Sequence, residues 1–255
     1  VGDLQDRRAA RETARKAEAV GMTGWFKEDV GVRYDESTGS EFEPATIEAT
    51  VDFLEPLASG GALELAIGTG RIAVPLAGRG VRIAGIDYSP PMVEQLRRKS
   101  SEIAVEIGDY TTTRVDGTFS LVYLVFNTIG NLTTQEAQVA AFENAARHLE
   151  PGSCFVIEVE LPPDRPWTVF DLSDTHVGVD EYDAYSHRLV SHHFTLRDGE
   201  WRRGSGEFRA VSPAELDLMA RLAGLTLSER WADWNRSPFT AESTKHVSVW
   251  AKPAG

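Results

Sequence analysis

The sequence predicts an α/β fold built on a doubly wound, mostly parallel sheet of seven strands. From residue 62 to residue 159, short apolar runs alternate with segments of helical periodicity. A glycine-rich turn joins the first strand to the first helix. Several of the strands are apolar along their whole length, as strands are when helices cover both faces of a sheet. A chain of 255 residues is long enough for one such domain with a modest insertion.

Each element follows from its local pattern. Strands are predicted at 62–67, 81–86, 103–107, 119–125, 154–159, 225–231 and 246–251, and helices at 4–20, 44–57, 72–77, 89–99, 133–149 and 212–223. Ser89, followed by two prolines, is typical of a helix start. A serine side chain can accept a hydrogen bond from an N–H group of the first turn, and a proline there removes only an N–H group that has no partner within the helix. The dipeptide Asp198-Gly199 predicts a β-hairpin formed by residues 185–196 and 201–211, inserted before the last helix.

The charge and composition exclude several classes of partner. The 39 acidic and 26 basic residues give a net charge of −13, which repels a phosphate backbone, so no nucleic-acid partner is expected. The apolar runs fall short of the roughly 18 residues that a membrane span needs, so no membrane partner is expected. The single cysteine, Cys154, forms no internal disulfide and fits a cytoplasmic protein. The six histidines show no metal-ligand spacing, so no metal is expected.

The glycine-rich turn predicts a nucleotide site. Residues 63–71 read Leu-Glu-Leu-Ala-Ile-Gly-Thr-Gly-Arg, and glycines there let the backbone pass close beneath a ligand at the carboxyl end of the sheet. The spacing Gly68, Gly70, Ala73 also satisfies the fingerprint of dinucleotide-binding proteins. The turn alone therefore does not exclude an NAD(P)-dependent oxidoreductase.

Three acids favour a different nucleoside. Glu64 lies inside the first strand, Asp87 ends the second and Asp109 follows the third. At those positions Glu64 suits an amino group of the ligand, Asp87 suits two ribose hydroxyls, and Asp109 suits an adenine amino group. Three carboxylates attract a ligand that carries a sulfonium and an ammonium, and they repel a pyrophosphate. The alternative for each acid is a helix cap or a solvated loop residue.

These motifs resemble those of the class I S-adenosylmethionine (SAM)-dependent methyltransferases, from Tyr34 through the last two strands. Ala66 stands where the first glycine of that motif is usual, and residues 85–92 and 108–110 are similar to the next two motifs. The resemblance implies SAM as cofactor, S-adenosylhomocysteine as product, an antiparallel terminal strand in the sheet, and a segment at 33–35 that closes over the cofactor. The cofactor-binding residues that it implies are Tyr34, Glu64, Ala66, Gly68, Thr69, Gly70, Arg71, Asp87, Tyr88, Met92, Gly108, Asp109, Tyr110 and Phe126.

The acceptor is expected beyond the fourth strand, in the segment 126–132, which contains the polar residues Asn127, Thr128 and Asn131. This segment more loosely resembles the aminosugar N,N-dimethyltransferases of natural-product pathways. Expected acceptor contacts are Asn127, Asn131, Trp167 and Tyr185, although the asparagines equally suit a role in the loop backbone and the aromatic residues a small core within the insertion.

The chemistry of methyl transfer needs alignment more than catalytic groups. A neutral amine needs only positioning, whereas a hydroxyl gains from a general base, for which His192 or His193 on the hairpin, or Glu158, is a candidate. His192 and His193 are neighbours on one strand and therefore point to opposite faces, so at most one enters the site.

The segments expected are an N-terminal helical arm and cofactor lid (1–43), a SAM-binding core (44–160), a substrate-capping β insertion (161–211), and a helix with a strand pair that complete the core (212–255). The predicted function is methyl transfer to nitrogen or oxygen of a small-molecule, natural-product or sugar-like acceptor. An NAD(P)-dependent oxidoreductase and a SAM-binding protein without turnover are the alternatives. The acceptor's identity and the oligomeric state, a homodimer among the options, stay open.

Overall fold

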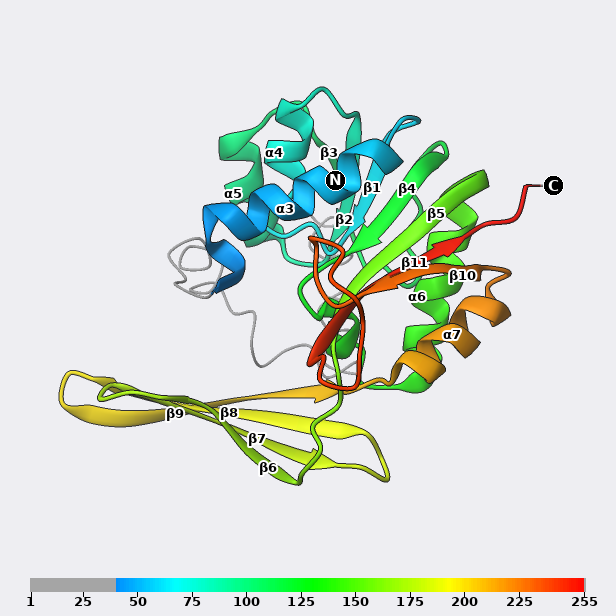
Figure 1. The fold of residues 1–255 in the computed structure, drawn as a ribbon. Helices are drawn as coiled ribbons and strands as arrows, with labels where there is room; N and C mark the ends of the chain where they lie inside the picture. The colour runs from blue at the N-terminus through cyan, green and yellow to red at the C-terminus, as the bar shows by residue number, and fades with distance from the viewer. Residues whose placement is uncertain (1–39, 255) are drawn as a thin grey trace, which may run out of the picture.

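The main sheet has seven strands in the order β10-β11-β5-β4-β1-β2-β3 (Figure 1). The computed structural model describes residues 40–254, so the predicted N-terminal helix and Tyr34 lie outside the described residues. The strands are β1 (Ala62–Leu65), β2 (Ile83–Asp87), β3 (Ala104–Ile107), β4 (Phe119–Leu124), β5 (Leu149–Glu160), β10 (Thr226–Trp231) and β11 (Lys245–Ala251). Strands β1 to β5 pair in parallel, and β11 pairs antiparallel with both β5 and β10. The predicted fold class is confirmed.

Helices cover both faces of this sheet. They are α3 (Pro44–Leu54), α4 (Ala73–Gly78), α5 (Pro90–Lys99), α6 (Gln135–His148) and α7 (Pro213–Leu222), with short 3₁₀ turns η1 (Ser40–Phe42), η2 (Glu55–Leu57) and η3 (Thr128–Asn131). Residues of α6 and α7 pack into one apolar cluster, and residues of α3, α4 and α5 pack into the other. None of the helices in residues 40–254 combines the length and hydropathy that a membrane crossing requires.

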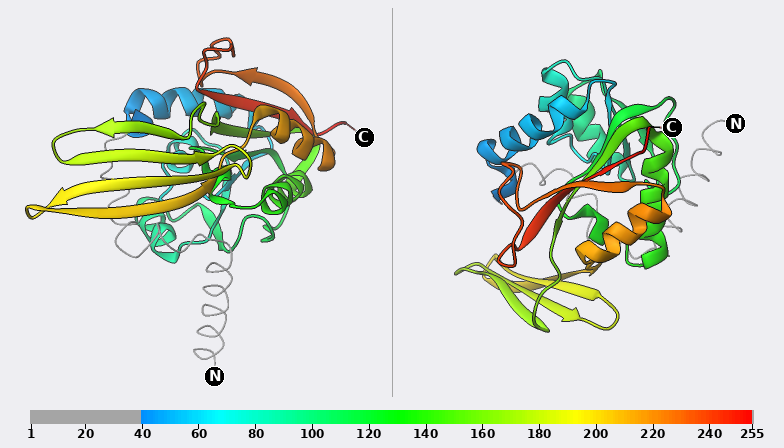
Figure 2. Two further views of the ribbon diagram at one scale, coloured as in Figure 1. Left: turned by 90° about the horizontal axis from the view of Figure 1, so that it is seen from below. Right: turned by 45° about the vertical axis from the view of Figure 1, so that its right-hand side comes forward.

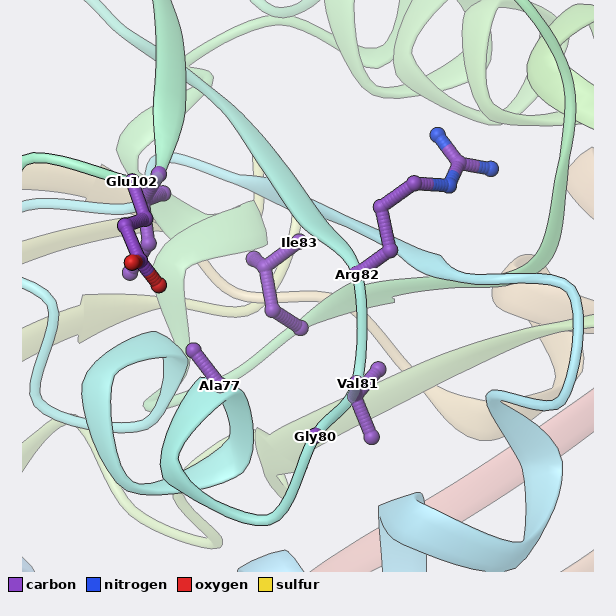
Figure 3. A pocket seen from close by; sticks show the side chains of 7 residues that line it. Ala77, Gly80, Val81, Arg82, Ile83 and Glu102 are labelled. Carbon is purple, nitrogen blue, oxygen red and sulfur yellow. The ribbon is translucent and has the colours of Figure 1, made fainter.

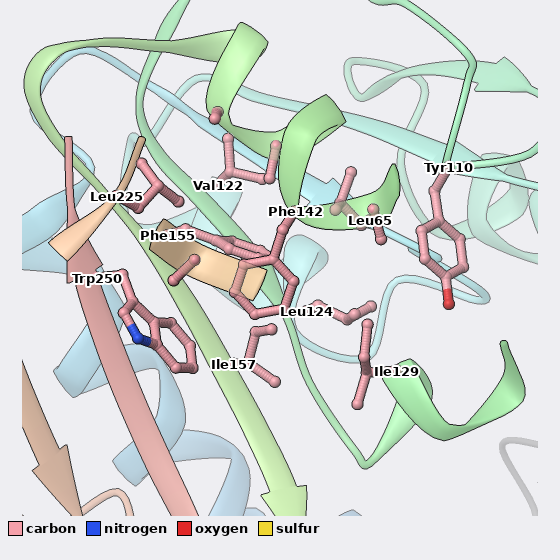
Figure 4. Close-up of a cluster of buried hydrophobic side chains, with 14 of the residues drawn as sticks. Leu65, Tyr110, Val122, Leu124, Ile129, Phe142, Phe155, Ile157, Leu225 and Trp250 are labelled. Atoms are coloured by element: carbon pink, nitrogen blue, oxygen red, sulfur yellow. The ribbon is translucent and has the colours of Figure 1, made fainter. Parts of the chain in front are cut away.

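Aromatic side chains fill the cluster beneath α6 (Figure 4). The ring of Phe142 meets those of Phe155 and Trp250 edge-on, at centroid separations of 5.1 and 5.3 Å. All three side chains are fully buried. Because edge-on pairs add to the gain from burial, this contact ties α6 to β5 and β11.

The alternation of side chains along β1 places one polar group, Glu64, in the interior of the protein. Leu63 and Leu65 point into the cluster beneath α6, whereas Ala62 points into the opposite cluster. Alternation along the strand therefore turns Glu64 toward the face that α3 and α4 cover, where it is only 3% exposed.

A second, four-stranded antiparallel sheet lies across the end of the main sheet toward which β4 and β5 run (Figures 1 and 2). Its strands are β6 (Trp167–Leu172), β7 (His176–Asp183), β8 (Arg188–Arg197) and β9 (Glu200–Arg209). The predicted hairpin is β8 and β9, joined at Asp198 and Gly199, both with positive φ. The sequence prediction missed β6 and β7, because the glycine and acids of β7 disfavour a strand.

Gly85 in β2 permits a close approach of the chain. A Cβ at this position would lie 2.5 Å from Cδ1 of Ile67 and 2.8 Å from its Cβ. We expect Gly85→Ala to lower the free energy of unfolding by about 1–3 kcal/mol, measured by urea denaturation. Gly78→Ala is the matched control, because a Cβ at the end of α4 meets nothing within 4 Å and alanine favours a helix. Wild-type stability in Gly85→Ala would show that β2 and Ile67 are not in contact.

Candidate active site

The glycine-rich turn after β1 uses left-handed backbone at three positions. Ala66, Gly68 and Gly70 have φ angles of 54°, 57° and 80°. A side chain at such a position costs roughly 1–2 kcal/mol, which gives a physical reason why glycine suits position 66. A Cβ at Gly70 would lie 2.9 Å from Val74, whereas one at Gly68 would meet only the Ala66 carbonyl oxygen, at 4.0 Å. The turn is therefore packed beneath Gly70 and open above Gly68, as a cradle for a nucleoside requires.

Asp87 fixes the shape of this turn from the end of β2. Its two carboxylate oxygens accept hydrogen bonds from the backbone N–H groups of Gly68 and Ser89, each at 2.7 Å. Burial raises the pKa of this carboxyl to about 6, against the lowering effect of the two hydrogen bonds. Each oxygen keeps a lone pair for a further donor, such as a ribose hydroxyl.

Glu64 is a buried carboxyl with one hydrogen-bond partner in β4. The hydroxyl of Tyr123 donates to its Oε2 at 2.9 Å. Burial raises the pKa of Glu64 to about 8, although the Tyr123 hydrogen bond and the positive charge of Arg71 both lower it. In the ligand-free protein the carboxyl is therefore largely protonated at neutral pH, and a nearby cation would ionise it.

Asp109 lies at the end of the neighbouring strand β3. Its Oδ1 accepts from the backbone N–H and the hydroxyl of Thr111, at 2.8 and 2.7 Å. The backbone N–H of Gly108 donates to the Asp87 carbonyl oxygen at 2.9 Å, which holds the two strand ends together. The three acids thus lie at one edge of the sheet, on strands that are adjacent in space. Their roles toward a cofactor stay predictions.

The other predicted cofactor residues lie around the same edge. Tyr110 is buried, and its hydroxyl donates to the Thr128 carbonyl oxygen at 3.1 Å. Met92 on α5 and Thr69 are buried, whereas Tyr88 is partly exposed. The structure thus gathers all of the predicted cofactor residues within the described part of the chain at the ends of β1 to β4.

Arg71 links the glycine turn to the segment after β4. Its guanidinium lies over the rings of Phe42 and Phe126, 5.5 and 5.4 Å from their centroids, and it donates to the Glu41 carbonyl oxygen at 2.7 Å. Phe126 has a φ of 58° and a side chain that is 40% exposed. An exposed ring beside a cation–π contact suits the wall of a ligand site.

Glu158, at the end of β5, holds the segment that carries Phe126. Its Oε2 accepts from the Phe126 backbone N–H at 3.0 Å, and its Oε1 accepts from the indole N–H of Trp234 at 3.0 Å and from Nζ of Lys245 at 3.3 Å. These contacts give Glu158 a positioning role, and its role as a base stays a prediction. The sequence reasoning missed Lys245, which only the pairing of β11 with β5 brings here.

Asn127 and Glu160 meet at the same end of the sheet. The Asn127 side chain donates to Oε2 of Glu160 at 3.5 Å and accepts from its backbone N–H at 3.3 Å. Burial, followed by the nearby charge of Asp180 on β7, raises the pKa of Glu160. Glu160 and Asp180 were not predicted, and no local sequence signal marks them. Asn131 ends η3 and is partly exposed.

Two of the predicted residues of the inserted sheet, Trp167 and His192, share one of its faces, and the third lies in a turn. Trp167 is 57% exposed and stacks on His192 at 6.4 Å, and Tyr185 is fully exposed in the turn between β7 and β8. Ser191 pairs with Asp180, so the neighbouring His192 points to the face away from Asp180. The roles predicted for Trp167, Tyr185 and His192 stay predictions.

Neither a metal site nor the cysteine of the described residues offers an alternative reactive group. In residues 40–254, no three His, Cys, Asp or Glu side chains are grouped so as to hold a metal. Burial raises the pKa of Cys154 to about 12, which removes it as a nucleophile. A hollow of about 250 Å³, lined by residues that include Ala77, Arg82 and Glu102, lies at the opposite edge of the sheet, where β2 and β3 begin (Figure 3).

The raised pKa of Glu64 predicts how stability depends on pH. Between pH 4.5 and about 8 the unfolded chain ionises Glu64 while the folded protein keeps the proton, so wild-type stability falls as pH rises. We expect Glu64→Gln to gain stability relative to wild type by about 1.4 kcal/mol per pH unit across this window, measured by urea denaturation of the ligand-free protein. Glu106→Gln, on an exposed position of β3, is the control. A difference between Glu64→Gln and wild type that does not change with pH would contradict the assignment.

Comparison with known proteins identifies the family. Residues 62–152 match the family described as "Methyltransferase domain". The structure of the CcbJ methyltransferase from Streptomyces caelestis superposes with a TM-score of 0.79 at 34% identity, covering 88% of this chain and 96% of that one. The cypemycin N-terminal methyltransferase of a Streptomyces species is 28% identical over 216 residues, which are 80% of this chain and 88% of that protein.

A structure with bound SAM shares the fold. It is an amino pentose methyltransferase from Micromonospora echinaspora, with a TM-score of 0.62 at 18% identity, covering 88% of this chain and 97% of that one. The predicted alternative of a nicotinamide-dependent oxidoreductase receives no support from these relatives. With its glycine turn and the three strand-end acids in the expected fold, the chain belongs to the SAM-dependent methyltransferases.

Proposed function

We propose that this enzyme transfers a methyl group from SAM to an amine nitrogen of a small natural-product or sugar-like acceptor. The observation that carries the proposal is the pair of acids, Glu160 and Asp180, that lies by Asn127 at the same end of the sheet as the strand-end acids. An amine reaches the site as an ammonium ion, which carboxylates attract and then deprotonate. The similarity to an enzyme named for methylating an N-terminus also favours nitrogen.

The residues at the strand ends fit the cofactor. Asp87 would accept the ribose hydroxyls, Asp109 the adenine amino group, and Glu64 the amino group of the methionine part, above the floor formed by Gly68 and Gly70. When bound, SAM supplies a methyl group activated by a positive sulfur. The raised pKa of Glu64 supports its role, because an ammonium ion nearby would stabilise the ionised carboxylate.

On the acceptor side, the chain's own residues orient the amine and move its proton. Phe126 offers an exposed ring and Asn127 a side-chain amide, and Glu158 holds the backbone of that segment. Asp180 has a buried Oδ1 without a hydrogen-bond partner among the described residues, so a donor N–H of the acceptor that reached it would satisfy it. Nucleophilic attack then needs only alignment and the exclusion of water.

The remaining assignments extend this proposal. Residues 44–160 and 212–255 would form the SAM-binding core, residues 161–211 would cap the acceptor, and residues 1–43 would close over the cofactor. We also propose a cytoplasmic enzyme, in keeping with its single cysteine. A homodimer is compatible with this proposal and does not affect it.

The cofactor assignment predicts separate losses of affinity at two strand ends. We expect Asp87→Asn and Asp109→Asn each to weaken SAM binding about 10- to 100-fold, because each loses charge-assisted hydrogen bonds worth about 1.5–3 kcal/mol. Calorimetric titration with SAM measures this, with NAD as a ligand that should give no heat. Asp116→Asn, on an exposed loop, should bind like wild type. Wild-type affinity in both Asp87→Asn and Asp109→Asn would contradict the proposed site.

The acceptor class is tested with a matched pair of sugars, one bearing an amino group and the other a hydroxyl at the same carbon. We expect SAM-dependent gain of one or two methyl masses on the amine, detected by mass spectrometry, and none on the hydroxyl. Methylation of the hydroxyl sugar alone would overturn the preference for nitrogen. SAM binding without any methylated product over a broad acceptor panel would favour a binding protein without turnover.

A further inference from the structure

Five side chains of the inserted sheet form a continuous hydrogen-bonded row. Asp171 Oδ2 lies 2.5 Å from His176 Nδ1, and His176 Nε2 lies 3.1 Å from His193 Nδ1. The other ring nitrogen of His193, Nε2, lies 3.2 Å from Oγ of Ser191. The Ser191 hydroxyl in turn hydrogen-bonds to the carboxylate of Asp180. Both ring nitrogens of each histidine are thus engaged along one line, which crosses β6, β7 and β8.

The row joins the acceptor side of the site to the surface. At its inner end, Asp180 is close enough to Glu160 to raise the pKa of that carboxyl, and Glu160 contacts Asn127. At its outer end, the Asp171 side chain is 49% exposed. Between them, burial lowers the pKa of His193 to about 4. His193 is therefore neutral at neutral pH, and a neutral imidazole both donates and accepts a proton.

We propose that Ser191, His193 and His176 form a proton relay that carries the proton of the methylated acceptor from Asp180 to Asp171 and so to water. The inference rests on the proposed function, because methyl transfer to an amine leaves an ammonium that must lose a proton before a second transfer. A site that excludes water for the reaction needs such an exit.

Each step of the relay is balanced. Asp180 takes the proton from the acceptor nitrogen and donates it to Oγ of Ser191, whose own hydrogen passes to Nε2 of His193. The proton on Nδ1 of His193 passes to Nε2 of His176, and the proton on Nδ1 of His176 passes to Asp171. One proton enters at Asp180 and one leaves at Asp171, and both rings change tautomer without a change in charge.

The neighbouring strand β9 adds no side chain to the row. On β9, the residues opposite Ser191 and His193 are Gly206 and Gly204, so no side chain from that strand interrupts the contacts. The next residue of β9 on this face is the exposed Arg202, opposite Thr195. The ring of Phe170 packs edge-on against His193 at 5.2 Å. His192 is the other titratable neighbour, and its charge lowers the pKa of His193.

The test removes a relay group that does not touch the acceptor. In His176→Gln we expect SAM affinity and thermal stability to stay within about twofold and 2 °C of wild type. Turnover on the amine should fall about tenfold in dilute buffer, and high concentrations of imidazole buffer should largely restore it. Ser191→Ala should show the same pattern. Arg203→Gln, exposed and on the opposite face of the sheet, is the matched control and should turn over like wild type at every buffer concentration.

Rescue by buffer separates proton transfer from a structural role, because added imidazole cannot repair misplaced strands. Wild-type turnover of His176→Gln in dilute buffer, or a loss that imidazole does not restore, would overturn the relay. If wild type methylates only the hydroxyl acceptor, the proposed preference for amines fails. The same variants then test the relay on that acceptor, since its proton must also leave.

Discussion

The structure depends on one electrostatic constraint: Glu64 and Asp87 are carboxyl groups held out of water at the edge of a parallel sheet. Burying a carboxylate is costly, and the protein offsets part of that cost with the Tyr123 hydroxyl and two backbone N–H groups. The cost that remains is visible as the raised pKa of both groups. A cationic ligand would remove it, so ligand binding and stability are linked through the same two side chains.

The fold explains why these groups converge. Parallel strands end at one edge, so residues that follow β1, β2 and β3 become neighbours although they are far apart in sequence. The left-handed turn at residues 66–70 brings the backbone beneath that edge, and Asp87 fixes the turn through Gly68. The inserted sheet crosses the same end of the molecule and brings Asp180 toward Glu160. The groups proposed to hold cofactor and acceptor therefore lie at one end of the molecule, because the two sheets share that end.

The sequence was sufficient for features with local signals. Apolar runs and the glycine turn predicted the seven strands, and the acids Glu64, Asp87 and Asp109 were found because each follows or interrupts such a run. Strands β6 and β7 were missed because their stability comes from cross-strand pairing that local composition does not reveal. The contact between Glu158 and Trp234 joins residues 76 positions apart, and the row from Asp171 to Ser191 needs three strands in register. Such groups become visible only when the fold is known.

If Glu64 holds the amino group of SAM, binding should ionise a carboxyl that the ligand-free protein keeps protonated. Calorimetric titration at pH 6.5 in two buffers of different ionisation enthalpy measures the protons exchanged on binding, at a pH where the amino group of SAM is already protonated. Wild type should release close to one proton more than Glu64→Gln does. Equal proton exchange by the two proteins, with SAM bound to both, would contradict it.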